Sequence, residues 1–453
     1  MKQIDMLHGP LPKKMLLFAL PIAASSILQQ LFNSADIAVV GQFAGSDAQA
    51  AVGGNSSVVS LLINLFAGLS VGANVVISNY IGQDRKKEVR EAVHTVIVVA
   101  LISGFAILAL GQLVAPPLLR LMDTPENVID QAVLYLRIYF AGMPFIMFYN
   151  FGSAILRSVG DTKKPLYCLM VSGVLNIGLN LLLVIVFQMS VAGVGIATLV
   201  SNAVSAAMMF VFLRRADKLI RLDLRRLGIK KNHLLRVIKI GVPAGIQGMV
   251  FSLSNVCIQT QINGFGSDAV AGSADAVNFE FFTYFITNAF SQTVVTFTGQ
   301  NFGANRHDRC KKILALGMMF GLIGTGIMSG TFVLLREYVI QPFTTDPAVI
   351  YYAMIRMLHV ELLTFMPVIY EVSAAAMRGM GYSMLPAVIT IVGTCALRFA
   401  WVYTVYPIFN TFEMLMNVYP ATWVVTGTAM MVTYFIVRKR AFAKYTAPMY
   451  ATE

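Results

Sequence analysis

The chain alternates long apolar runs with short charged or turn-rich breaks. A helix needs about 20 predominantly apolar residues to cross a bilayer, and the runs reach this length repeatedly. The pattern predicts twelve membrane-spanning helices, at about 14–42, 50–80, 92–114, 128–156, 165–187, 190–213, 234–262, 269–299, 312–334, 348–376, 385–407 and 418–437. We therefore expect an all-α integral membrane protein.

Landmarks of the first half recur in the second half at an offset of about 221 residues. The matched segments are GSDA at Gly45–Ala48 and Gly266–Ala269, YIGQDRKKE from Tyr80 and NFGANRHDR from Asn301, and RSVGDTKKP from Arg157 and RGMGYSMLP from Arg378. Pro21 and Pro243 also match, early in the first and seventh spans. Four landmarks in one order indicate an internal repeat.

The repeat predicts an N-lobe at residues 1–213 and a C-lobe at 234–453, with six spans each, joined by a basic linker at 214–233. Six is an even number, so both lobes insert with the same orientation. They should be related by a pseudo-twofold axis along the membrane normal, with the substrate path at their interface.

Charge supports a membrane location and gives an orientation. Only 12% of the residues are charged and 57% are hydrophobic, with a mean hydropathy of +0.71. Most of the 34 basic residues behind the net charge of +12 lie in alternate loops, at 2–14, 85–90, 157–164, 214–239, 306–312 and 438–444. The positive-inside rule then places both termini in the cytoplasm, in a cell inner membrane. The basic charge is explained by topology, and we expect no nucleic-acid partner.

Polar residues inside the first, fifth and sixth spans are costly and therefore candidates for function. Asp36 shares a helical face with Gln29 and Asn33, and lies at a similar depth to Asn176, Asn180 and Thr198. One carboxylate, two amides and a hydroxyl suit a small cation such as Na⁺, or a protonatable Asp with hydrogen-bond partners. The alternative is that Asn176, Asn180 and Thr198 only join helices to one another.

The remaining acidic residues inside spans are Glu280, Glu361 and Glu371. Glu280 and Glu371 either face a water-filled cavity that attracts a cationic substrate or pair with a nearby polar group. We expect His359 and Arg398 to form local hydrogen bonds or pairs. The predicted substrate cavity is lined by Gln30, Asn33, Glu280, Tyr284 and Glu371.

Signals for an enzyme are missing from the sequence. The four cysteines, Cys168, Cys257, Cys310 and Cys395, are scattered singly and have no histidine at metal-ligand spacing. No Ser-His pair at recognisable spacing and no glycine-rich phosphate loop is present. We predict neither a catalytic residue nor a cofactor, nor a metal site beyond a possible Na⁺ site at Asp36.

The sequence resembles the multidrug and toxic compound extrusion (MATE) transporters over nearly its whole length. The resemblance is carried by LPIAASSILQQLFNSADIAVVGQFAG in the first span, SVGANVVISNYIGQD at the end of the second, RSVGDTKKP, NIGLN, and VAGVGIATLVS. It implies a V-shaped pair of six-helix lobes that expel amphipathic, often cationic compounds in exchange for Na⁺ or H⁺. It also implies that Asp36 is the essential carboxylate and that the first helix bends at Pro21.

The chain departs from the family pattern at three places. Some members have an Asp where this chain has Asn180. The stretch Pro243–Gln261 lacks the acid that one branch carries in its seventh span, and that branch's tenth-span acid aligns with Pro367, one turn before Glu371. The two departures in the second half make a coupling site in the C-lobe doubtful and favour coupling in the N-lobe. We therefore predict a cation-coupled, monomeric efflux antiporter in contact with membrane lipid. The alternative is a flippase of lipid-linked oligosaccharides or related lipids, and a membrane-embedded enzyme is disfavoured.

Overall fold

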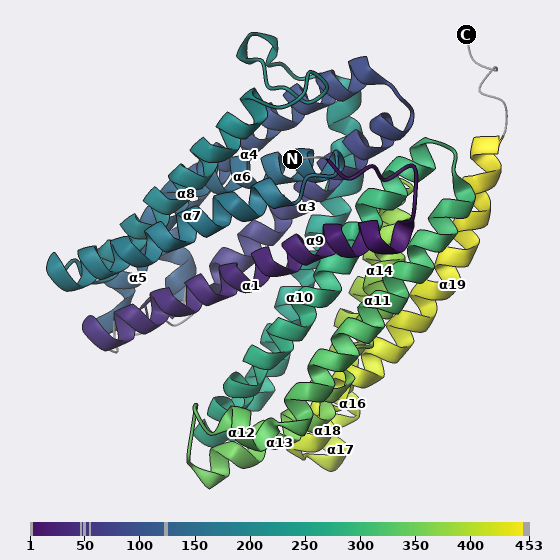
Figure 1. Ribbon diagram of the computed structural model, residues 1–453. Helices are drawn as coiled ribbons and strands as arrows, with labels where there is room; N and C mark the ends of the chain where they lie inside the picture. The colour runs from purple at the N-terminus through teal and green to yellow at the C-terminus, as the bar shows by residue number, and fades with distance from the viewer. Residues whose placement is uncertain (1–2, 46–47, 49–50, 54–55, 122–125, 447–453) are drawn as a thin grey trace. The chain divides into compact units, whose positions relative to one another are not determined.

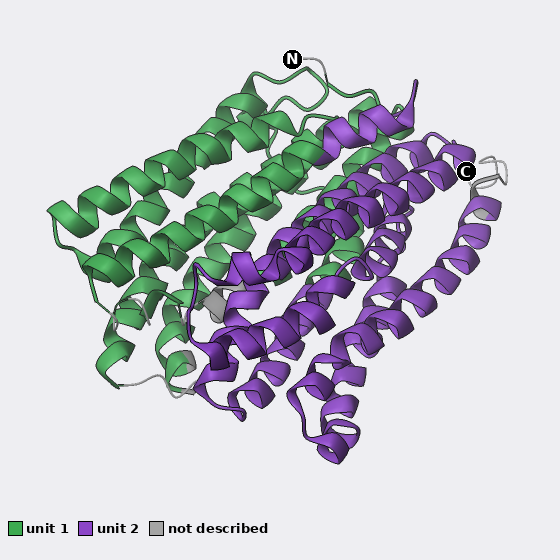
Figure 2. Cartoon of the chain, turned by 60° about the horizontal axis from the view of Figure 1, so that its bottom comes forward, with its two compact units in different colours: residues 1–5, 20–245 green, residues 6–19, 246–453 purple. Residues whose placement is uncertain are grey.

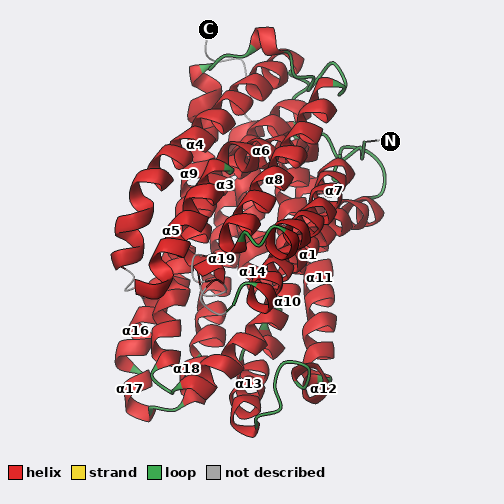
Figure 3. Cartoon of the chain, turned by 90° about the vertical axis from the view of Figure 1, so that its left-hand side faces the viewer, coloured by secondary structure: helices red, strands yellow, loops and turns green. Residues whose placement is uncertain are grey.

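The computed structural model describes residues 3–45, 48, 51–53, 56–121 and 126–446. Within these ranges the chain forms helices and no strand (Figure 3). Helices satisfy their backbone hydrogen bonds within one segment, as a hydrocarbon environment requires. The predicted all-α membrane fold is confirmed.

Membrane spans account for most of the helical residues. Nine of the described helices are long and apolar enough to cross a membrane. Two bent pairs, Glu126–Ala141 with Met143–Ser158 (46°) and Pro347–Leu363 with Pro367–Gly379 (41°), raise the count to eleven if each pair is one span. Each second member has a proline at its start, which interrupts the helical hydrogen bonds there. The predicted span 269–299 corresponds to α10 (Ser267–Gly303), which is long enough for a crossing with 37 residues but is not among the described helices that are also apolar enough, so the predicted count of twelve stays a prediction.

The chain divides into two compact units. Unit 1 comprises Met1–Asp5 and Leu20–Gly245, and unit 2 comprises Met6–Ala19 and Ile246–Glu453 (Figure 2). The helices of unit 1 are most of α1 (Leu11–Phe43), α3 (Ser56–Gly82), α4 (Lys86–Leu121), α5 (Glu126–Ala141), α6 (Met143–Ser158), α7 (Lys163–Asn180), η1 (Leu181–Val186), α8 (Ser190–Arg214), η2 (Leu224–Arg226) and the first part of α9 (Lys231–Asn263) (Figure 1). Those of unit 2 are the remainder of α1 and α9, α10, α11 (His307–Leu334), α12 (Arg336–Ile340), α13 (Pro347–His359), η3 (Glu361–Leu363), α14 (Pro367–Gly379), α15 (Met384–Thr390), η4 (Ile391–Ala396), α16 (Leu397–Thr404), α17 (Tyr406–Phe409), α18 (Phe412–Met416) and α19 (Val418–Thr446).

Two long helices, α1 and α9, contribute residues to both units. The division falls between Ala19 and Leu20 in α1, and between Gly245 and Ile246 in α9. Both positions lie within two residues of a proline inside the helix, Pro21 or Pro243. The lobe boundaries expected from sequence, 1–213 and 234–453, follow chain order and stay a prediction.

Turn geometry carries the signature of the internal repeat. Gly45 and Gly266 both have positive φ, at 92° and 97°, and Gly160 and Gly381 have φ of 89° and 90°. Asp84 and Asn305 form a third pair, with φ of 54° and 57°. All three pairs have the spacing of the sequence repeat, and each lies in one of its matched segments. Ser46 and Asp47 of the first GSDA lie outside the described residues.

Four glycines allow α3 and the first part of α9 to cross at very close range in unit 1. A Cβ on Gly68 would lie 2.2 Å from the backbone nitrogen of Gly245, and one on Gly72 would lie 2.4 Å from the carbonyl oxygen of Val237. Gly241 similarly faces the backbone of α3, 2.6 Å from a Cα atom. Both helices therefore present a G-x-x-x-G stripe, which favours backbone contact between helices in lipid.

The predicted basic linker, 214–233, is fixed to α4. The backbone N–H of Asp223 donates to Nε2 of His94 at 3.1 Å. Thr95 accepts from the N–H of Lys230 at 3.2 Å and donates to the carbonyl of Gly228 at 3.3 Å. The segment is thus held in place by side chains of α4.

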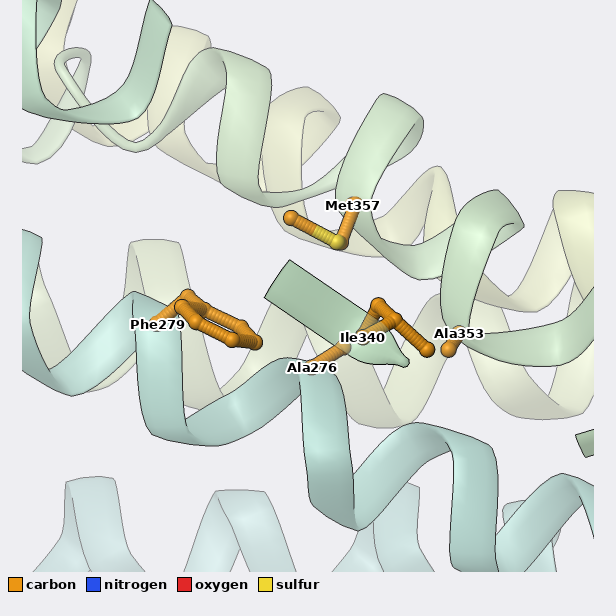
Figure 4. Close-up of a cluster of buried hydrophobic side chains, with 5 residues drawn as sticks. All are labelled: Ala276, Phe279, Ile340, Ala353 and Met357. Carbon is orange, nitrogen blue, oxygen red and sulfur yellow. The ribbon is translucent and has the colours of Figure 1, made fainter. Parts of the chain in front are cut away.

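The core of unit 2 includes a cluster where α10, α12 and α13 meet. It consists of Ala276, Phe279, Ile340, Ala353 and Met357, all buried (Figure 4). Small alanines on α10 and α13 leave room for the larger side chains between them, as close packing requires. The cluster holds α10 and α13 together in the region that carries the buried ion pair described below.

Candidate functional site

A network of polar side chains joins α1, α7 and α8 inside unit 1. Asn180 donates through Nδ2 to Oδ1 of Asp36 and to Oδ1 of Asn176, the latter at 3.2 Å. Thr198 donates to Oδ2 of Asp36 at 3.4 Å, and Asn176 donates to Thr198 at 3.5 Å. The structure therefore brings together all four residues predicted to form the ion-coupling site.

Local packing explains how α1 approaches α7. Gly173 lies under the ring of Phe32, and a Cβ at this position would be 1.8 Å from the ring's Cε2 atom. Asp36 follows Phe32 by one turn, and Asn176 and Asn180 follow Gly173 by one and two turns, so the polar groups share the same interface. Because Gly173 has no side chain, α1 lies close enough to α7 for the carboxylate of Asp36 to reach the amide of Asn180.

The backbone hydrogen-bond pattern of the helix changes directly after Asn180. Residues Leu181–Val186 form a π-helix, η1, which continues from the end of α7. A π-helical turn shifts the hydrogen-bond register and is frequent at functional sites. The network therefore lies next to a segment whose backbone hydrogen bonds differ from those of a regular α-helix.

Asp36 is buried and, in the part of the chain that the structure describes, has no basic partner. The residue is 7% exposed and Asn180 is 0% exposed. Among the described residues, no basic side chain forms an ion pair with Asp36. The two tyrosines close enough to interact with it electrostatically, Tyr135 and Tyr139, are neutral donors or acceptors. A carboxylate kept in apolar surroundings without a basic partner needs a cation or a proton to offset the cost of its charge.

One acceptor in the network has no donor. Oδ1 of Asn180 is buried and makes no hydrogen bond within the described residues. A small cation bound beside Asp36 can be coordinated by this oxygen, by the carboxylate and by the hydroxyl of Thr198. A protonated Asp36 can instead donate its hydrogen to an amide oxygen of this kind. The arrangement is chemically suited to either H⁺ or Na⁺.

The other residues predicted on the first helix are less buried than Asp36. Helix α1 continues through Pro21, whose carbonyl accepts a hydrogen bond from the hydroxyl of Ser25 at 2.8 Å. Gln30 is half-buried, whereas Gln29 and Asn33 are exposed. Only Asp36 of the expected polar face therefore turns into the network.

Glu280 in unit 2 has a fixed basic partner. Its Oε1 and Oε2 accept hydrogen bonds from Nε and Nη2 of Arg356 at 2.6 and 3.0 Å, and Nη1 of Arg356 donates to Ser273 at 2.6 Å. Of the two interpretations left open by the sequence, a cavity-facing acid and a paired acid, the structure shows the paired one. Sequence spacing gave no indication that Arg356 would be this partner.

Three further acidic or aromatic groups lie in the interior of unit 2. Glu361 is fully buried and accepts from Thr283 at 2.6 Å, while its Oε2 has no donor within the described residues. Glu371 is half-buried and close enough to Tyr284 and Arg378 for electrostatic interaction. Gln30 and Asn33 belong to unit 1, and Glu280, Tyr284 and Glu371 belong to unit 2. Their common role in a substrate cavity stays a prediction.

Two smaller sequence predictions concern His359 and Arg398 in unit 2. Nδ1 of His359 lies 2.8 Å from Oδ1 of Asn417, and Arg398 donates to Asn255 at 2.8 Å, so both form the local hydrogen bonds expected of them. All four cysteines are free. Within the part of the chain that the structure describes, no three His, Cys, Asp or Glu residues are grouped to hold a metal ion.

Comparisons with known proteins agree with this architecture. The family model described as MatE matches residues 21–182 and 243–404. The probable multidrug resistance protein YoeA of Bacillus subtilis is 29% identical over 392 residues, which cover 84% of this chain and 83% of that protein.

Solved structures share the fold at low sequence identity. A multidrug resistance MATE family transporter in an outward-facing conformation superimposes with a TM-score of 0.89 at 21% identity, covering 98% of both chains. A MOP superfamily transporter from Pyrococcus furiosus, whose binding pocket has reversed polarity suggesting a different function, gives a TM-score of 0.90 at 21% identity, with 98% and 99% coverage. At this identity, both similarities bear on the fold alone.

Proposed function

Because the chain belongs to the MatE family of membrane transporters, we propose that it is a cation-coupled antiporter that exports amphipathic, often cationic compounds. The multidrug resistance assignment of the relative YoeA favours substrates of this kind. The single observation that carries the coupling is the burial of Asp36 among neutral polar groups, with no basic partner among the described residues.

The proposed cycle uses a change in the charge of the Asp36 network. Binding of H⁺ or Na⁺ neutralises the carboxylate and changes the hydrogen bonds to Asn180 and Thr198. Since these residues lie on α7 and α8, the change alters how α1 is held. A bend of α1 near Pro21 then accompanies substrate release. Ion and substrate compete if they stabilise different conformers, because a ligand shifts an equilibrium only through differential affinity.

The test is Asp36→Asn in proteoliposomes, with Na⁺ and pH gradients imposed separately. Asparagine preserves the size of the side chain, but it carries no negative charge that could bind H⁺ or Na⁺. Gradient-driven dye export should therefore fall to the level of protein-free vesicles. A matched control is Asp84→Asn, because Asp84 is exposed, with φ of 54°, and its repeat counterpart is Asn305 with φ of 57°. Export by Asp36→Asn at the rate of the control would refute the coupling role.

We further propose that the protein resides in the inner membrane with both termini in the cytoplasm and acts as a monomer without a cofactor. The alternate basic loops support this orientation through the positive-inside rule. A reporter fused after residue 446 and active only in the cytoplasm would test it. An inactive reporter on a stably inserted chain would contradict the orientation.

A further inference from the structure

Arg398, on α16 of unit 2, is a buried arginine for which the described residues provide a hydrogen-bond acceptor at Nη1 but not at Nε or Nη2. Its side chain is 1% exposed, and Nη1 donates to Oδ1 of Asn255 at 2.8 Å. The guanidinium lies over the rings of Phe251 and Tyr419, at 5.2 and 4.7 Å from their centroids. These aromatic faces stabilise the positive charge but accept no in-plane hydrogen bond.

The opposite edge of the guanidinium, formed by Nε and Nη2, meets no acceptor from the described part of the chain. Nε and Nη2 are both buried and form no hydrogen bond within the described residues, and no described carboxylate lies within 4.0 Å of Arg398. The guanidinium of arginine is positively charged and carries only hydrogen-bond donors. Leaving a buried charged donor unsatisfied costs more than leaving a neutral one.

The Nε–Nη2 edge of another arginine in the same unit, Arg356, binds a carboxylate. Its Nε and Nη2 hold both oxygens of Glu280 at 2.6 and 3.0 Å, while Nη1 binds a neutral side chain, Ser273. Its guanidinium also lies over the ring of Tyr419, at 5.4 Å. The two arginines thus share an aromatic ring and a neutral partner on Nη1, and they differ in that only Arg356 has a carboxylate on the Nε–Nη2 edge.

We infer that the Nε–Nη2 edge of Arg398 binds an oxyanion, a carboxylate or phosphate, carried by an amphipathic ligand of the transporter. Two parallel N–H donors match the oxygens of such a group, which is the usual reason for arginine at these sites. The inference rests on the proposed export of amphipathic compounds. It adds anionic and zwitterionic molecules to the cationic ones considered above.

A second feature of the chain lies next to Arg398 in sequence. Residues Ile391–Ala396 form a π-helix, η4, which ends two residues before Arg398. In unit 1, the π-helix η1 begins directly after Asn180. Since π-helical turns are frequent at functional sites, we expect η4 to shift when an oxyanion binds the guanidinium.

The experiment compares two dyes that differ in one group, a cationic rhodamine ethyl ester and the corresponding free acid. Their equilibrium binding is measured by fluorescence polarisation on the full chain in phosphatidylcholine nanodiscs. Such binding requires neither an ion gradient nor transport, so it is independent of the coupling role of Asp36.

Two variants test the edge in different ways. Arg398→Lys keeps a positive charge but removes the paired donors, and should weaken binding of the free acid by roughly tenfold or more, since a hydrogen bond to a charged group is lost. Asn255→Asp places an internal carboxylate beside the guanidinium and should weaken the free acid similarly. Neither should change ester binding more than the control Arg137→Lys, at an exposed arginine of α5.

The outcomes separate the two proposals. Loss of the free acid with retention of the ester in both variants supports the oxyanion site. Equal loss of both dyes indicates a structural role for Arg398 and overturns the inference, while the proposed export function stands. Binding of neither dye by the unmodified chain would overturn both.

A second arm identifies the source of the oxyanion. Phosphatidylglycerol is titrated into the nanodiscs while free-acid binding is followed. Competition that is present in the unmodified chain and absent in Asn255→Asp assigns the edge to a lipid phosphate. Without such competition, a selective loss in the variants assigns it to the exported ligand.

Discussion

Replacing Gly173 with alanine puts a methyl group where the ring of Phe32 now lies. The added Cβ would be 1.8 Å from Cε2, 2.0 Å from Cζ and 2.4 Å from Cδ2 of the ring. Ordinary carbon contacts lie at about 3.5–4.0 Å, so the ring must retreat by about 2 Å. Thr198 and Asp36 are already 3.4 Å apart, close to the limit for a hydrogen bond, and Asp36 is one turn from Phe32. The substitution should therefore loosen the coupling network.

The expected size of the effect follows from the cost of overpacking. Inserting a methyl group into a packed interface typically costs about 1–3 kcal/mol. If that cost falls on ion binding, the affinity for the coupling ion drops by about fivefold to a hundredfold, at about 1.4 kcal/mol for each factor of ten. The assay is the Na⁺ or H⁺ concentration that gives half-maximal dye export in proteoliposomes.

Helix α7 supplies a matched control for this experiment. Gly178 lies five residues further along α7, and a Cβ there would meet nothing within 4 Å. Gly178→Ala should leave the half-maximal concentration unchanged. Adding Phe32→Leu to Gly173→Ala should recover part of the loss, because the two side chains compete for one space. Equal behaviour of the two alanine variants would refute the proposed role of this contact.

Two further predictions concern the stability of each unit. Arg356→Ala leaves the carboxylate of Glu280 buried and unpaired and should lower the free energy of unfolding by about 3–5 kcal/mol. Thermal unfolding in detergent measures this change. A loss below about 1 kcal/mol would show that the ion pair does not stabilise the fold. Gly72→Ala places its Cβ 2.4 Å from the carbonyl oxygen of Val237 and should destabilise by about 1–3 kcal/mol, whereas Gly330→Ala, with nothing within 4 Å, should not. Equal melting temperatures of the two alanine variants would contradict the close crossing of α3 and α9.

The sequence was most informative where a property repeats along one segment. Apolar length predicted the spans, and the matched turns around Gly160 and Gly381 predicted the repeat that their φ angles now support. Depth within a span placed Asp36 beside Asn180 and Thr198, because residues on neighbouring helices at one depth can meet.

Pairings between distant segments were harder to predict. The partner of Glu280 lies on α13, and neither periodicity nor depth distinguishes Arg356 from other basic residues there. The contact of Phe32 with Gly173 depends on which faces of α1 and α7 meet, which one sequence does not specify. The G-x-x-x-G spacing at Gly68 and Gly241 was a visible signal for the α3–α9 crossing. The two π-helices left no recognisable pattern.

The sharing of α1 and α9 between the units has a consequence for biosynthesis. Residues Met6–Ala19 leave the ribosome early but belong to a unit whose remaining residues begin at Ile246. Unit 1 in turn waits for residues up to Gly245, and until then the glycine stripe of α3 lacks the helix that covers it. Domains usually fold in order as they emerge, but neither unit of this chain can be completed from one half of the gene. A nascent chain arrested in the linker would therefore expose unfinished surfaces in both units to the membrane and to quality control.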